Sequence, residues 1–127
     1  MGYLPNLTFS KDKRLLKASE FQEVFDTNTF KIAHPKLLML AKFNDREKSR
    51  LGLVVGKKNI PSAVDRNYVK RIVRETFRLE YFIQPIDVVF LARKDAHKLS
   101  SEDMTLLLQQ SWCRLQQRCG KKEKNNA

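Results

Sequence analysis

Residues 62–82 read "SAVDRNYVKRIVRETFRLEYF", and this stretch decides the fold of the chain. It begins with a Ser-x-x-Asp start signal, in which Ser62 and Asp65 cap the first turn of a helix. Mostly apolar side chains then share one face at helical spacing: Val69, Ile72, Val73, Thr76, Phe77 and Tyr81. We therefore predict a long helix over about residues 62–82, with that face packed on a sheet.

Strand patterns lie on both sides of this helix. Residues 51–59, "LGLVVGKKN", and residues 86–93, "IDVVFLAR", are rich in aliphatic and β-branched side chains. Pro85 prevents the helix from continuing into the second strand. Two strands joined through a long helix cannot form a hairpin, so the sequence predicts a parallel crossover pair.

A shorter helix and a strand are expected ahead of this unit. Ser19 and Gln22 have the spacing of a capping box at a helix start. Three apolar side chains then share one face of the short helix: Phe21, Val24 and Phe25. Residues 34–43, "HPKLLMLAKF", follow as a buried strand.

The chain ends in an amphipathic helix over residues 99–119, followed by Gly120 as a stop and a basic tail. The order of elements is a helix, two or three strands, the long helix, a strand and a helix. We take it as α-β-β-β-α-β-α, which predicts an α/β (α+β) two-layer sandwich in which helices cover one sheet. At 127 residues we expect a single domain, residues 1–127. Its core is placed at about residues 9–118, with a flexible tail over residues 119–127.

The long helix also carries a stripe of positive charge. Asn67, Arg71, Arg74 and Arg78 recur on one side, with Arg66 and Lys70 beside them. Such a stripe is either a solvated face or a face for phosphate groups. Lys plus Arg is 25 and Asp plus Glu is 14, and the resulting net charge of +11 favours a nucleic acid partner.

Several functional classes lack support in the sequence. No apolar run approaches the roughly 20 residues that span a bilayer, and residues 1–14 lack a signal-peptide pattern, so a cytoplasmic protein is expected. The two cysteines, Cys113 and Cys119, point to different faces of a helix, and neither histidine is near them in sequence, so no zinc spacing is present. No motif of a protein nuclease or other hydrolase is present.

The basic helix and its flanks resemble a known family. "RNYVKRIVRETFR" is similar to the signature helix of the bacterial ribonuclease P protein subunit, which reads Arg-Asn-Arg, then Lys-Arg, then Arg-Glu or Arg-Gln. "RLLKASEFQEVF", "RLGLVVGKKN" and "DVVFLARKDA" resemble the neighbouring family segments in the same order, so the resemblance covers about residues 9–118. Tyr68 departs from the pattern at the third position of the triplet, where it could stack on a base or simply pack.

This resemblance implies a fold and a function. The family fold is like domain 2 of ribosomal protein S5, with a left-handed crossover against the usual right-handed rule. Family members bind the catalytic RNA subunit of ribonuclease P and the single-stranded 5′ leader of precursor tRNA. The RNA, with Mg²⁺, removes the leader to give the mature 5′ end. The chain is then expected to be part of an endoribonuclease, without catalytic residues, a metal site or a bound cofactor of its own.

The matching positions carry roles residue by residue. For the RNA subunit, the resemblance implies contacts from Arg66, Asn67, Lys70, Arg71 and Arg74. For the leader, it implies contacts from Phe21, Phe25, Val54, Lys57, Lys58, Arg93 and Lys94. Aromatic faces and cations suit a single strand, but the two phenylalanines could instead be core and the two loop lysines could be solvated charges.

Three other functions fit parts of the pattern. A non-catalytic ribosomal or ribosome-assembly protein would share the basic α/β build. A DNA-binding factor would place residues 66–78 in a major groove, but a recognition helix usually follows another helix across a short turn. A protein-only nuclease lacks its site. The partners that the resemblance implies are the catalytic RNA and the precursor tRNA leader, with no membrane and no DNA expected.

Overall fold

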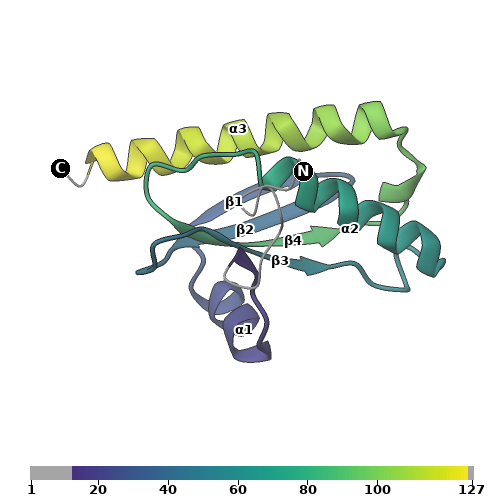
Figure 1. Cartoon of the computed structure of the whole chain (residues 1–127), viewed down its shortest axis with the longest axis horizontal. Coiled ribbons are helices and arrows are strands. Elements are labelled where there is room, and N and C mark those ends of the chain that lie inside the picture. Colours follow the sequence, from purple (N-terminus) through teal and green to yellow (C-terminus); the bar gives the residue numbers. More distant parts are fainter. Residues whose placement is uncertain (1–12, 126–127) are drawn as a thin grey trace, which may run out of the picture.

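A computed structural model describes residues 13–125, with side chains described up to residue 120. Helices lie on both faces of one four-stranded sheet (Figure 1). The elements are α1 (Ala18–Thr27), β1 (Phe30–His34), β2 (Leu37–Phe43), β3 (Arg50–Val54), α2 (Ala63–Phe77), β4 (Ile86–Ala92), the short 3-10 helix η3 (Ala96–Lys98) and α3 (Ser101–Asn125). The predicted order α-β-β-β-α-β-α is confirmed.

The sheet has the strand order β1-β2-β4-β3. β2 is antiparallel to both β1 and β4, whereas β3 pairs with β4 in parallel. Because α2 connects β3 to β4, the predicted parallel crossover is confirmed. Its left hand stays a prediction from the resemblance.

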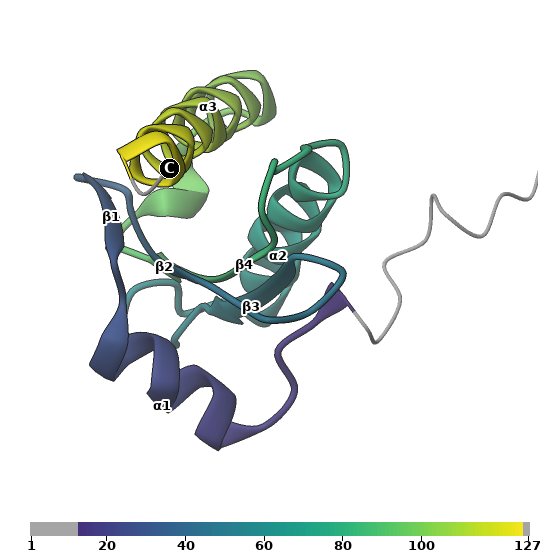
Figure 2. The ribbon, with the colours of Figure 1, turned by 90° about the vertical axis from the view of Figure 1, so that its left-hand side faces the viewer.

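Side chains alternate between the two faces of the sheet, and helices cover one face fully and the other only in part. Figure 2 shows α2 and α3 together on the first face and α1 alone on the second. Trp112 of α3 is fully buried, and its indole N–H donates to the Thr76 hydroxyl of α2 at 2.9 Å. A buried indole needs such a partner, so this contact fixes α3 against α2. The sheet and the α2–α3 layer form the predicted sandwich, and α1 adds cover on the opposite face.

α2 begins as predicted but ends earlier. The Ser62 hydroxyl accepts the N–H of Asp65 at 3.5 Å, which caps the first turn. The helix stops at Phe77 because Phe82 turns back into the core, where the two rings lie 6.2 Å apart. The placement of Tyr81 on the buried face is wrong, since this residue is 77 % exposed in the connection to β4.

Two boundaries near the start of the chain also differ from prediction. Residues 34–43 do not form one continuous strand. A turn at residues 35–36 separates the end of β1 from the start of β2, and the two strands form a hairpin. α1 starts without the predicted capping box of Ser19 and Gln22. Instead, the Glu20 carboxylate accepts the N–H of Lys17 at 2.9 Å and closes the first turn.

α3 is longer than predicted, since it continues through Gly120 to Asn125. A glycine ends a helix by taking a positive φ, and none of the described glycines does so. A glycine inside a helix costs only about 1 kcal/mol, which one position can tolerate. Most of the predicted tail is therefore helical, while residues 126–127, and residues 9–12 of the predicted core, lie outside the described residues.

Candidate nucleic-acid interface

The partly covered face of the sheet is organised in three rows, each crossing β2, β4 and β3. One row, the polar row, consists of Lys42, Asp87 and Arg50. The middle row consists of Leu40, Val89 and Gly52. The third, which we call the open row, consists of Leu38, Leu91 and Val54.

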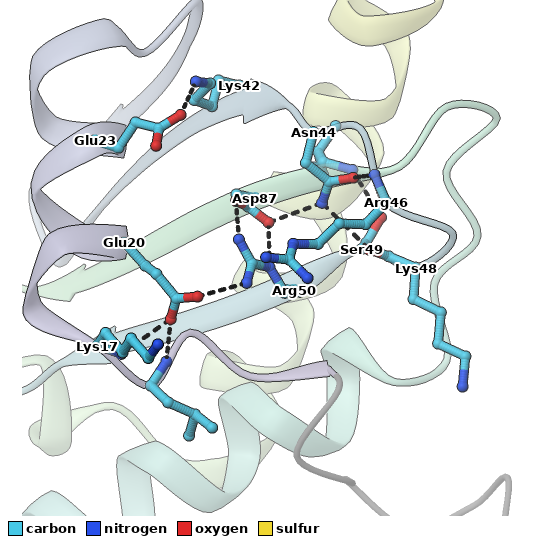
Figure 3. Close-up of polar contacts among 12 residues, drawn as sticks. Lys17, Glu20, Glu23, Lys42, Asn44, Arg46, Lys48, Ser49, Arg50 and Asp87 are labelled. Carbon is cyan, nitrogen blue, oxygen red and sulfur yellow. Dashed lines mark hydrogen bonds and ion pairs between the residues drawn. The ribbon is translucent and has the colours of Figure 1, made fainter.

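The polar row contains a buried ion-pair network (Figure 3). Arg50 donates to both carboxylate oxygens of Asp87, from Nε at 2.8 Å and from Nη2 at 2.6 Å. Its Nη1 donates to Oε2 of Glu20 on α1, also at 2.8 Å. Arg50 and Asp87 are only 8 % and 7 % exposed, and Asn44 donates to Asp87 as well. This network fixes the start of α1 at one end of the sheet.

Glu20 is the residue that joins α1 to this network. Its Oε1 accepts the N–H of Leu16 at 2.8 Å and that of Lys17 at 2.9 Å. The hydrogen bond from Lys17 is the largest cause that lowers the pKa of Glu20 to about 2; burial opposes it, and Leu16 and Arg50 reinforce it. Beside it, Glu23 pairs with Lys42 of the polar row at 2.5 Å.

We expect the free energy of unfolding to fall as the pH is lowered from about 4.5 to about 2. The pKa of Glu20 is lower in the folded protein than in the unfolded chain, so its stabilisation is complete above pH 4.5 and is lost as the folded carboxylate is protonated. Glu20→Gln should lower stability at neutral pH and flatten this acid branch, measured by urea unfolding across pH. Glu23→Gln is the control, because that side chain is 65 % exposed. Equal flattening in both variants would contradict this assignment.

α1 lies directly on the middle row. Val24 is fully buried and packs with Val89, while Phe21 lies against Gly52. A Cβ atom on residue 52 would come within 2.6 Å of the Phe21 ring, so a glycine there allows the close approach. Phe21 is half-buried as a result, and it contributes to packing as well as to the surface beside α1.

The open row lies on the far side of α1 from the polar row. Its three side chains are partly exposed, because α1 is fastened to the polar and middle rows. Phe25 follows Phe21 by one turn of α1 and is 37 % exposed. An apolar strip with aromatic side chains at its border is therefore accessible on this face.

Basic loops border one end of the open row. β3 and β4 are parallel, so both end on the same side of the sheet, just beyond Val54 and Leu91. Asn59 ties the two following loops together, since its Nδ2 donates to the carbonyl of Ala92 at 2.9 Å. Four exposed cations lie in these loops: Lys57, Lys58, Arg93 and Lys94. The seven residues predicted for the leader thus lie in or around the open row: Val54 is part of it, the two phenylalanines are on α1 beside it, and the four cations are in the loops at its end.

α2 carries the residues predicted for the RNA subunit, in two strips. Asn67 and Arg71 are exposed on the crest of the helix. Lys70 and Arg74 are half-buried on the flank that faces β3, where they line a cavity together with Arg14. The cationic surface therefore extends from the crest of α2 toward the segment that precedes α1.

Arg66 is placed differently from the other four. Its Nη1 donates to the carbonyl oxygens of Ile60 and Pro61 at 3.0 Å and 2.7 Å. These contacts hold the loop that leads into α2. Arg66 thus has a local structural contact, whatever else its remaining N–H groups bind.

Tyr68 lies between the cationic surface of α2 and α3. Its ring packs against the main core and lines a groove of about 340 Å³ between α2 and α3. Arg71 and Arg78 of α2 line the same groove, as do Thr105 and Gln109 of α3. At this position the chain uses an aromatic side chain to pack α2 against α3.

We expect Tyr68→Ala to lower the free energy of unfolding by about 2 kcal/mol, because it removes a half-buried ring from the α2–α3 contact. Asn67→Ala, at the exposed neighbouring position, should change stability by less than about 0.5 kcal/mol. Urea unfolding of both variants measures the difference. Equal stabilities would show that the ring contributes nothing to packing.

Among the described residues, no group of three or more His, Cys, Asp or Glu side chains is placed to hold a metal ion. The described helices include none that is long and apolar enough to cross a membrane. Cys113 is exposed and Cys119 is buried, and both are free thiols. Burial raises the pKa of Cys119 to about 11, which leaves it as a protonated, packed side chain at neutral pH.

Comparison with known proteins decides the family. The family model described as Ribonuclease P matches residues 9–116. The chain belongs to the ribonuclease P protein family. The ribonuclease P protein component of Marinobacter nauticus is 39% identical over 112 residues, which is 88% of this chain and 85% of that protein. That of Pseudoalteromonas atlantica is 40% identical over 117 residues, 91% of this chain and 97% of that protein.

Solved structures support the same family. The Staphylococcus aureus ribonuclease P protein matches with a TM-score of 0.71 and 27% identity, covering 78% of this chain and 91% of that one. The Thermotoga maritima ribonuclease P protein matches with a TM-score of 0.66 and 26% identity, covering 83% and 96%. The bacterial ribonuclease P protein fold is thus confirmed. Membership makes the chain a protein component of the ribonuclease P holoenzyme, a tRNA-processing enzyme.

Some residues of this ribonuclease P surface were missed from the sequence. Leu38 and Leu91 of the open row were not predicted, although alternation along each strand was an available signal. The network of Glu20, Arg50 and Asp87 had no local signal, because its members come from three separate elements. Their contact depends on strand register, which the sequence does not state directly.

Proposed function

We propose that this protein is the ribonuclease P subunit that binds the catalytic RNA through α2 and the single-stranded 5′ leader of precursor tRNA along the open row. The RNA subunit, with Mg²⁺, carries out the endonucleolytic removal of the leader, and the protein positions the substrate. The observation that carries the proposal is an apolar strip that α1 leaves open and that basic loops border, on a sheet whose other face carries the cationic helix α2 (Figure 2).

The charges on α2 support the contact with the RNA subunit. Within the described part of the chain, Lys70, Arg71 and Arg74 form no ion pair with a carboxylate. Their positive charge is therefore not neutralised by the neighbouring side chains. Phosphate groups along an RNA backbone supply the opposite charge, and arginine can hold two phosphate oxygens at once.

The open row supports the contact with the leader. A single strand binds where bases can stack on flat side chains while cations follow the phosphates, largely without reading sequence. Phe25 and part of Phe21 supply exposed aromatic surface next to the row. The exposed cations of the two tied loops, Lys57, Lys58, Arg93 and Lys94, supply the charge.

Reconstitution with a bacterial ribonuclease P RNA tests the proposal as a whole. The purified protein alone should leave precursor tRNA uncut. Added to the RNA, it should lower the Mg²⁺ concentration needed for cleavage and increase the preference for precursor over mature tRNA. An unchanged Mg²⁺ requirement together with an unchanged preference would sink the proposal.

We expect Phe25→Ala to weaken binding of precursor tRNA by about 1–3 kcal/mol, the value of one stacked base. Affinity for mature tRNA and for the RNA subunit should stay as in the wild type. Mature tRNA has no leader, and the RNA subunit is proposed to bind α2 and not the open row. Leu106→Ala is the matched control, since Leu106 is an exposed apolar residue of α3 on the other side of the sheet. Equal weakening for precursor and mature tRNA would count against a leader contact.

A further inference from the structure

A cavity of about 200 Å³ opens between the segment that precedes α1, the edge strand β3 and the flank of α2. Three cations line it, Arg14, Lys70 and Arg74, together with the apolar side chains of Phe21, Leu51 and Leu53. The backbone of Arg14 forms a parallel bridge with Leu51, and the N–H of Leu15 donates to the Leu51 carbonyl at 3.1 Å. Cations from two distant parts of the sequence thus line one cavity at the outer edge of β3.

Two of these cations are not balanced within the described part of the chain. The side chains of Lys70 and Arg74 make no ion pair or hydrogen bond there. Arg74 is half-buried, and burial, followed by the charge of Arg14, lowers the pKa of its guanidinium. A half-buried cation that faces a second cation is stabilised by an anion bound between them.

We propose that this cavity is a phosphate site, in which one phosphodiester group of bound RNA is held between Arg14, Lys70 and Arg74. The inference rests on the proposed function and adds Arg14, on a segment that neither RNA surface includes. Arginine forks and a lysine ammonium together satisfy the several lone pairs of a phosphate. Phe21 of α1 reaches the same cavity, so this phosphate lies where the α2 surface meets the leader surface.

A double-mutant cycle with Arg14→Gln and Arg74→Gln tests whether the two arginines share one phosphate. Each single change should weaken RNA binding about tenfold and should reduce the slope of log affinity against log salt by about one. The double variant should be little weaker than either single variant, because losing one arginine already releases the shared group. Arg114→Gln, on an exposed part of α3, is the charge-matched control and should change affinity little.

Two RNA ligands identify the source of the phosphate. The cycle is measured with the isolated RNA subunit and with a single-stranded leader oligonucleotide. Coupling with the first ligand assigns the phosphate to the RNA subunit, and coupling with the second assigns it to the leader. Effects that multiply, with the slope of the double variant reduced by about two, would mean separate phosphates and overturn the proposal. Wild-type binding of both ligands by Arg14→Gln would overturn it as well.

Inorganic phosphate provides a readout that does not depend on RNA. Its titration should shift the Nε–Hε NMR resonances of Arg14 and Arg74, and it should raise the unfolding temperature of the wild type more than that of Arg74→Gln. An equal rise in the wild type, Arg74→Gln and Arg114→Gln would show that the cavity is no phosphate site. If the protein binds inorganic phosphate in this cavity but binds neither the RNA subunit nor the leader oligonucleotide, the proposed function is wrong while the anion site stands.

Discussion

Arg50→Met should lower the free energy of unfolding by about 3–5 kcal/mol, the usual cost of leaving one buried charge without its partner. Asp87 would remain 7 % exposed without the guanidinium that binds both of its oxygens, and Glu20 would lose its tie to the sheet. Because small domains are stable by only about 5–15 kcal/mol, this single change removes a large fraction of the total. Urea unfolding at neutral pH measures it.

Two further variants separate charge burial from loss of packing. Arg50→Met combined with Asp87→Leu should recover part of the loss, because an apolar pair replaces the buried ion pair. Lys42→Met, in the same row, should cost less than about 1 kcal/mol, since its partner Glu23 is 65 % exposed. If the double variant is no more stable than Arg50→Met alone, the uncompensated charge of Asp87 is not the cause.

Arg71→Ala and Arg74→Ala together should give the largest loss of affinity for the RNA subunit. In the proposed contact, each arginine would form charge-assisted hydrogen bonds to a phosphate worth about 1.5–3 kcal/mol, so loss of the pair should weaken binding by about 3 kcal/mol or more. The slope of log affinity against log salt should fall by about two, one for each lost phosphate contact. Filter binding or calorimetry over a range of salt concentrations measures both quantities.

The control for this pair is Arg114→Ala with Arg118→Ala, two exposed cations of α3. They remove the same charge from the opposite part of the helical layer, so a general effect of net charge would appear in both double variants. If affinity and slope stay at wild-type values in Arg71→Ala/Arg74→Ala, the cationic residues of α2 are a solvated face and do not bind the RNA subunit.

Local signals in the sequence predicted the helices best where capping residues are present. The start of α2 follows from Ser62 and Asp65, and its hydrogen bond is present in the fold. The end of α2 could not be read from periodicity, because Tyr81 continues the apolar pattern although it is exposed in the connection to β4. Burial of the Phe82 ring, a tertiary effect, determines where the helix stops.

The candidate site was predictable in part for a similar reason. Residues that carry charge at i, i+4 on one helix, such as Lys70 and Arg74, share a strip by spacing alone. The different role of Tyr68 could not be predicted, because its position depends on where α3 packs. The contacts of Arg66 and the convergence of Arg14 with α2 also depend on loops whose paths no spacing rule gives.

The separation of the three rows has a consequence for how such proteins evolve. The polar contacts that fasten α1 fall on the polar row, whereas Leu91 and Val54 of the open row are only partly buried against the cluster of Leu15, Val24 and Val89. Substitutions on the open row should therefore cost less stability than substitutions in the network of Glu20, Arg50 and Asp87. If the row binds the leader as proposed, leader preference could diverge between lineages while the attachment of α1 is inherited unchanged.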